Sequence, residues 1–239
     1  MPPRQPISKF ETHEVANQPP PVPEFNWFDG DLVLRQALDR EGAGWAAGNV
    51  RAFGAILGSE HTAELAGSAN RFPPELRTFD RFGRRIDEVD YHPAYHELMH
   101  LAKTHEVHSI AWTAPRPGGH VAHMALEYLL VQADAGICCP ITMTYASVAA
   151  LARESSVASE WTPRILAPSY DSRFIPAQEK TGVTIGMAMT EKQGGSDVRT
   201  NTTSAEPVGN AGEYELTGHK WFCSTPMSDA FLTLARTTS

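Results

Sequence analysis

The spacing of apolar residues along the chain predicts a helical front part and a strand-rich end. Between Asp31 and Asn70 apolar positions recur at helical intervals, and Ser59 is placed to cap a helix within this stretch. From Thr184 onward, short β-branched and apolar runs alternate with Gly, Asn and Asp, which is typical of strands. The pattern predicts an α+β chain, with an N-terminal all-α domain followed by an antiparallel β-domain.

Prolines and glycines mark the ends of the remaining predicted elements. Pro93 suits the first turn of a helix that runs to about Lys103. The helix after Gly118 is expected to stop at Gly136, because glycine is the usual residue just past a helix end. The other predicted elements are helices over 141–153 and 156–166, a short hairpin over 78–86, and strands over 200–206, 213–217 and 231–236.

The sequence pattern changes from helical to strand-like near residues 175 to 183, and this change marks a domain boundary. Residues 1–24 are rich in proline, which fixes φ and removes a donor, so they are expected to form an extended arm. The arm either packs on a neighbouring subunit or makes no stable contacts. Residues 25–180 are predicted to form the helical domain, and residues 181–239 the first part of the β-domain.

Composition narrows the class of protein. The net charge of -8 gives no support for nucleic-acid binding, which needs concentrated positive charge. The three cysteines match neither a disulfide framework nor a zinc spacing, and buried thiols in a reducing cytosol are the simpler interpretation. There is no apolar run long enough for a membrane span and no signal pattern, so a cytoplasmic protein with no membrane partner is expected.

One motif suggests metal chemistry. His96-Glu97-Leu98-Met99-His100 matches H-E-x-x-H, which on a helix sets two imidazoles on one face for zinc. Pro93 places His96 in the first helical turn, and the glycine and third histidine of the extended motif are replaced by Lys103 and Glu106. A histidine-rich, partly exposed helix is the favoured interpretation, no metal ligand is assigned, and a zinc metallopeptidase is kept as an alternative.

The stretch from Gly186 to Asp197 has the residue types that a flavin dinucleotide needs. An apolar strand leads to Thr190, whose hydroxyl can serve the ring edge that becomes negative on reduction. Gly195 and Ser196 can serve the pyrophosphate through backbone N–H groups and a hydroxyl. The Rossmann G-x-G-x-x-G is absent, so any dinucleotide is held differently.

A second block follows at Glu213 to Ser224. Its pattern predicts a strand, a turn and a second strand that contains aromatic residues and ends at Ser224, which carries a hydroxyl. An aromatic ring can stack on isoalloxazine, and a hydroxyl can bond the flavin N5 region.

Together the two blocks resemble the middle-domain signature of the acyl-CoA dehydrogenase superfamily, and the whole chain is most similar to its AidB-type DNA-alkylation-response flavoproteins. The stretches that carry the resemblance are residues 40–45, 139–144, 189–197 and 218–222, and it spans roughly residues 12 to 239. It implies an acyl-CoA dehydrogenase-like fold and FAD as the cofactor.

The resemblance also implies roles for single residues. Phe222 takes the place of the family's flavin-packing tryptophan, and Ser224 that of the threonine near N5, so Trp221 is expected in the core. Lys192 and Met187 depart from the family's proline and common aromatic, which weakens any assignment of a fatty-acyl substrate. The residues expected to contact FAD are Met187, Ala188, Met189, Thr190, Gly195, Ser196, Phe222, Cys223 and Ser224.

The resemblance places the catalytic centre elsewhere. The family's base is a glutamate of a helical bundle that follows the β-domain, so no catalytic residue is expected in this chain, and Glu191 is expected to support its turn. The chain is expected to be the truncated front part of such a protein and inactive alone. The family reaction is α,β-dehydrogenation of an acyl-CoA, with hydride transfer to flavin N5.

The resemblance implies partners as well. Acyl-CoA or a related small molecule is the expected substrate, DNA binding is expected only through a later C-terminal region, and the full protein is expected to be a homotetramer. A non-enzymatic DNA-protection protein that uses FAD structurally is the second hypothesis.

Overall fold

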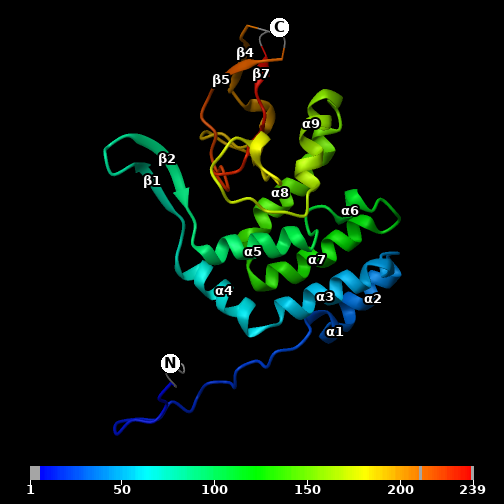
Figure 1. The fold of residues 1–239 in the computed structure, drawn as a ribbon, viewed down its shortest axis with the longest axis vertical. Coiled ribbons are helices and arrows are strands. Elements are labelled where there is room, and N and C mark those ends of the chain that lie inside the picture. The colour runs from blue at the N-terminus through cyan, green and yellow to red at the C-terminus, as the bar shows by residue number, and fades with distance from the viewer. Residues whose placement is uncertain (1–5, 210–211, 238–239) are drawn as a thin grey trace.

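The computed structural model describes residues 6–209 and 212–237. Residues 1–5 of the predicted arm, and residues 210–211 and 238–239 of the predicted β-domain, lie outside the described residues. Helices form the body of the molecule and most strands lie at the C-terminal end (Figure 1). The helices are α1 (Trp27–Gly30), α2 (Leu32–Arg40), α3 (Ala47–Leu57), α4 (Glu60–Arg71), α5 (Pro93–Thr104), α6 (Ile110–Thr113), α7 (Gly119–Ala133), α8 (Ala135–Leu151) and α9 (Ser155–Leu166). The strands are β1 (Glu75–Phe79), β2 (Arg85–Asp90), β3 (Ile185–Ala188), β4 (Ser204–Pro207), β5 (Tyr214–Thr217), β6 (Ala230–Thr233) and β7 (Arg236–Thr237).

The proline-rich residues 6–24 run as an exposed, extended segment away from the helical body (Figure 1). Their one regular backbone pairing is the isolated bridge between Lys9 and Glu14. The predicted domain boundaries at residues 24 and 180 stay predictions.

A large apolar core holds the helical body together. Phe53 and Leu57 of α3 pack with Leu98 of α5 and with leucines of α7, and all of these side chains are almost fully buried. Burying each such side chain stabilises the fold by about 1.5–3 kcal/mol. The predicted cap at Ser59 is confirmed, since its side chain accepts a hydrogen bond from the Thr62 N–H. No helix within residues 6–209 and 212–237 is both long and apolar enough to cross a membrane.

The boundary predicted at Gly136 is wrong. Helix α7 ends at Ala133, and Gly136 lies inside α8, which begins six residues before the predicted start at Ile141. The reason is Asp134, whose side chain caps α8 by accepting a hydrogen bond from the Ile137 N–H at 3.0 Å. The hydrogen bond between the Asp134 side chain and the Ile137 N–H fixes the start of α8 here, and it outweighs the tendency of glycine to follow a helix end.

The predicted hairpin is confirmed and is longer than expected. Strands β1 and β2 pair antiparallel from Glu75 to Asp90 and project from the helical body (Figure 1). At the turn the Gly83 N–H donates to the Asp80 carbonyl, and the Asp80 carboxylate accepts from the Phe82 N–H. Gly83 has φ 79°, a left-handed conformation that glycine adopts without steric cost.

The strands after residue 184 form small sheets of mixed direction. The α+β class is confirmed, but within residues 184–209 and 212–237 only the β4–β5 strand pair is antiparallel; β3 pairs with β6, and β4 with β7, in parallel. Parallel pairing needs a long connection, and the chain between β3 and β6 supplies one. The predicted flavin residues lie mostly in this connection.

A buried lysine joins the helical body to the strand region. Lys103 of α5 is fully buried, and its ammonium donates to the carbonyls of Ile165 and Val183 at 3.0 and 3.2 Å. Close to Lys103, Lys180 and Asp229 form a buried ion pair at 2.6 Å, and the Thr184 N–H donates to the same aspartate. Burial lowers the pKa of Lys103 to about 7, against a smaller opposing effect of Asp229.

This shift predicts a pH-dependent stability. An unfolded lysine titrates near pH 10.4, so between about pH 7 and pH 10.4 the unfolded chain binds the proton that the folded chain has lost. The free energy of unfolding therefore rises with pH across this window. Lys103→Met should remove the rise, measured by urea unfolding at several pH values. Lys9→Met, on the exposed arm, is the control; equal slopes for both variants would refute the assignment.

Candidate functional site

The two motif blocks that sequence analysis singled out lie against each other. Glu191 of the first block forms an antiparallel bridge with Lys220 of the second. On either side, the Trp221 N–H donates to the Thr190 carbonyl at 2.9 Å and the Lys192 N–H donates to the His219 carbonyl at 3.1 Å. The backbone therefore fixes both blocks in one site.

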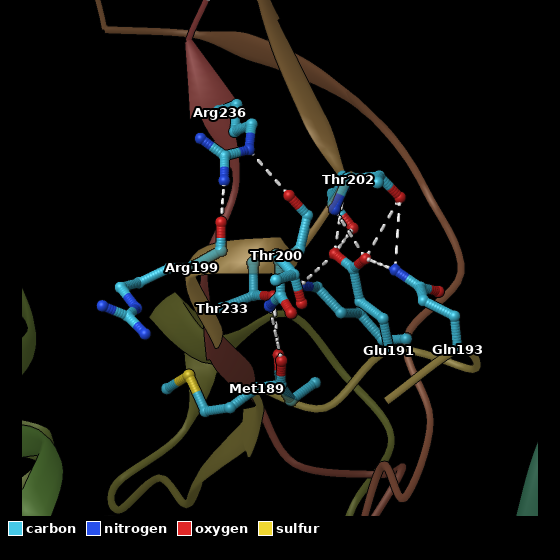
Figure 2. Close-up of polar contacts among 12 residues, drawn as sticks. Met189, Glu191, Gln193, Arg199, Thr200, Thr202, Thr233 and Arg236 are labelled. Carbon is cyan, nitrogen blue, oxygen red and sulfur yellow. Dashed lines mark hydrogen bonds and ion pairs between the residues drawn. The ribbon is translucent and has the colours of Figure 1, made fainter. Parts of the chain in front are cut away.

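The carboxylate of Glu191 is the centre of this junction. It is 1% exposed and accepts hydrogen bonds from the Thr202 and Thr203 N–H groups at 2.7 and 2.9 Å, and from the Thr203 hydroxyl. The Lys220 ammonium adds an ion pair at 3.0 Å. Figure 2 shows the carboxylate between Gln193, whose amide donates at 2.5 Å, and the Thr202 backbone. Glu191 thus supports the turn, as the sequence indicated, and is not free to act as a base.

These contacts set the protonation state of Glu191. Burial alone would raise the pKa of the carboxyl, but the hydrogen bonds from Thr202 and Thr203, with that from Lys220, outweigh burial and hold the pKa well below its ordinary value. The carboxylate therefore stays ionised near neutral pH. Its contribution to stability is present above the unfolded pKa and is lost as the pH falls through the lower folded value.

Thr190 and Gly195, both predicted flavin residues, are in close contact. A Cβ atom added at Gly195 would lie 2.7 Å from the Thr190 hydroxyl oxygen, whereas one added at Gly194 would meet nothing within 4 Å. Only a residue without a side chain fits against Thr190. Among the described residues, no hydrogen bond uses the backbone N–H of Gly195 or Ser196. Adjacent unpaired N–H groups of this kind suit an anion such as a pyrophosphate.

The strand that leads to Thr190 is held firmly. Met187 and Ala188 belong to β3 and pair with Leu232 and Thr233 of β6. The Thr233 hydroxyl donates to the Ala188 carbonyl at 2.8 Å. Met189 follows half-buried, and its carbonyl accepts from the Asn201 amide at 2.9 Å (Figure 2). The backbone of this segment is therefore in a fixed position for a ligand.

The second block differs from its prediction. Residues 221–224 form no strand, and Trp221 is 44% exposed, so its expected place in the core is wrong. The alternation of inward and outward side chains, on which that expectation rested, holds only within a strand. Phe222 has φ 58° and is 76% exposed. A bulky residue at positive φ is strained, and strain of this kind is common at ligand sites.

Cys223 and Ser224 line a cavity that sequence reasoning did not find. It has a volume of about 490 Å³ and lies between the 223–226 loop and residues that include Tyr91 just after β2, Tyr95 of α5 and Cys139 of α8. A second cavity of about 260 Å³ adjoins it and extends to His96 and Tyr170. The aromatic residues flanking Pro93 were a signal for this site, but nothing in the sequence shows that Tyr170 joins them.

The H-E-x-x-H residues have other partners. His96 Nδ1 lies 2.9 Å from the Tyr170 hydroxyl, and Glu97 accepts from His61 at 2.9 Å. His100 is exposed. In the described part of the chain, no three His, Cys, Asp or Glu side chains are grouped to hold a metal ion. The geometry gives the zinc hypothesis no support.

Comparison with known families agrees with this architecture. The acyl-CoA dehydrogenase middle domain matches residues 186–239, and the adaptive response protein AidB N-terminal domain matches residues 17–172. The chain belongs to the acyl-CoA dehydrogenase family. Within that family it belongs to the AidB branch.

Individual relatives give the same result. AidB of Escherichia coli (strain K12) is 46% identical over 95% of this chain, and acyl-CoA dehydrogenase family member 11 of Caenorhabditis elegans is 29% identical over 86%. Two solved structures share the fold. Bd2924 in its apo form has a TM-score of 0.76 and 29% identity over 89% of this chain, and C. elegans ACDH-11 in complex with C11-CoA has 0.75 and 25% identity over 98%. The chain spans 42% and 33% of the two sequence relatives, and 42% and 40% of the two structures.

The Glu191 junction predicts the effect of removing its charge. Glu191→Gln should lower the melting temperature, because Lys220 is left largely buried without an anion and an amide NH₂ faces N–H donors. Adding Lys220→Met should recover part of the loss, since removing both partners costs less than removing one. Differential scanning calorimetry measures both effects, with the exposed Glu206→Gln as control. Wild-type melting of Glu191→Gln would contradict the role of this carboxylate.

Proposed function

We propose that the chain binds FAD through the segments 187–196 and 222–224, the residues that the resemblance pointed to. The observation that carries the proposal is the contact between Gly195 and Thr190, with unpaired backbone N–H groups directly beside it. A hydroxyl is thus held next to a small anion site. This is the donor set that the ring edge and pyrophosphate of a flavin dinucleotide need.

The other residues of the segment fit the same ligand. Phe222 presents an exposed ring that can stack on isoalloxazine, and Ser196 is exposed beside the unpaired N–H groups. Lys192 adds an exposed positive charge close to this turn. Ser224 lines the larger cavity and can donate a hydrogen bond at its edge.

The reaction that we propose for the full protein is α,β-dehydrogenation of an acyl-CoA. The family supports it, as does the C. elegans relative that was solved with C11-CoA. Bound FAD would supply the two-electron acceptor. The residues of this chain bind and orient: Thr190 and Ser224 offer hydroxyls to the flavin edge, and the cavity beside Ser224 receives the acyl group. No residue of this chain is assigned as the base.

The remaining expectations extend the proposal to the full protein. A homotetramer, a cytoplasmic location and a role in the DNA-alkylation response stay predictions from the resemblance to the AidB branch.

Two adjacent glycines test FAD binding directly. Gly195→Ala should weaken FAD binding by about tenfold or more, because its Cβ would overlap the Thr190 hydroxyl that the ring needs. Gly194→Ala, whose Cβ meets open space, should bind FAD like the wild type. Fluorescence titration of the apoprotein with FAD gives both dissociation constants.

Equal dissociation constants for the two variants would show that FAD does not depend on this contact. Equal melting temperatures for the variants without FAD confirm that the difference arises in the ligand site rather than in the fold.

A further inference from the structure

The two cavities beside the predicted flavin segment share part of their lining, and together they are called the chamber. Both are lined by Val89 and Tyr91 of the β2 end, by Tyr95 of α5 and by Thr225. The larger cavity contains Ser224 in its wall, and the smaller one leads away from it toward α5. A ligand in either cavity therefore lies beside Tyr91 and Tyr95.

The inner part of this chamber is an aromatic cluster. The rings of Tyr91 and Tyr95 stack at a centroid distance of 4.2 Å, and both meet the His96 ring edge-on at 6.1 and 5.6 Å. The Tyr170 ring stacks on the His96 ring at a centroid distance of 5.8 Å. Flat faces and edges of π systems favour another flat ring over a flexible alkyl chain.

Polar groups oppose a long alkyl chain in the same space. Asp90, Asp171 and Lys180 also line the smaller cavity, and any apolar group that covers them removes water without replacing its hydrogen bonds. A compact ring has less apolar surface to place against them than an extended alkyl chain with the same number of carbons. The Tyr91 and Tyr95 hydroxyls form no hydrogen bond with any described residue. Burial raises the pKa of both phenols, so they remain neutral donors.

The size of the smaller cavity suits one ring. An apolar cavity of about 150 Å³ holds a benzene molecule. A space of about 260 Å³, lined in part by His96 and Tyr170, therefore accepts a phenyl group with a substituent.

We propose that the chamber selects an acyl group that carries an aromatic ring, held against Tyr91 and Tyr95 with its far edge toward the His96–Tyr170 pair. This inference rests on the proposed acyl-CoA function and names the substrate class of that site. Tyr91 and Tyr95 are then specificity-determining residues, although no sequence motif marks them.

Binding of two matched thioesters tests the inference. Isothermal titration calorimetry of the FAD-loaded full protein compares 3-phenylpropionyl-CoA with nonanoyl-CoA, which has the same number of acyl carbons. We expect the aromatic thioester to bind about tenfold tighter. Tyr91→Leu should remove the preference. Tyr128→Leu, on an exposed tyrosine of α7 outside the chamber, should keep it.

Each outcome decides a different claim. Equal or tighter binding of nonanoyl-CoA overturns the aromatic preference and leaves the acyl-CoA function standing. Binding of neither thioester to the FAD-loaded protein overturns both. An unchanged preference in Tyr91→Leu shows that selection arises elsewhere and also overturns the inference.

Discussion

The buried carboxylate of Glu191 is the point on which the site depends. It lies between two segments that are separate in sequence, and it accepts hydrogen bonds from Thr202 and Thr203 while pairing with Lys220. A buried charge is stable only when such partners surround it, so the carboxylate and its donors must assemble together. Once they have, the backbone bonds beside them set the position of Thr190 relative to Trp221.

The position of Thr190 determines which groups of the site can contact a ligand. Thr190 holds Gly195 in a contact that excludes any side chain, and the neighbouring loop turns Phe222 outward at positive φ. The helical body adds the other wall of the chamber, and the buried Lys103 connects α5 to α9 through the Ile165 carbonyl and to the segment before β3 through the Val183 carbonyl. The flavin site and the acyl site that we propose would thus share the 222–225 loop.

The sequence predicted the parts that depend on local pattern. Helical periodicity, the cap at Ser59 and the α+β class are confirmed. The flavin segment, inferred from its residue types and a family resemblance, stays a prediction. The errors arise where tertiary contacts outweigh local preference. Asp134 placed the helix boundary before Gly136, and an irregular loop left Trp221 exposed. The burial of Lys103 and the tyrosine chamber depend on contacts between distant segments, which no spacing rule reports.

Hydrogen–deuterium exchange of the full protein, with and without FAD, tests the central claim most directly. The account predicts that FAD slows exchange of backbone amides in residues 187–197 and 221–224, above all at the unpaired N–H groups of Gly195 and Ser196. It predicts no such change in the exposed arm of residues 6–24. If FAD binds and protects a different segment, or if it does not bind, the account of this site is contradicted.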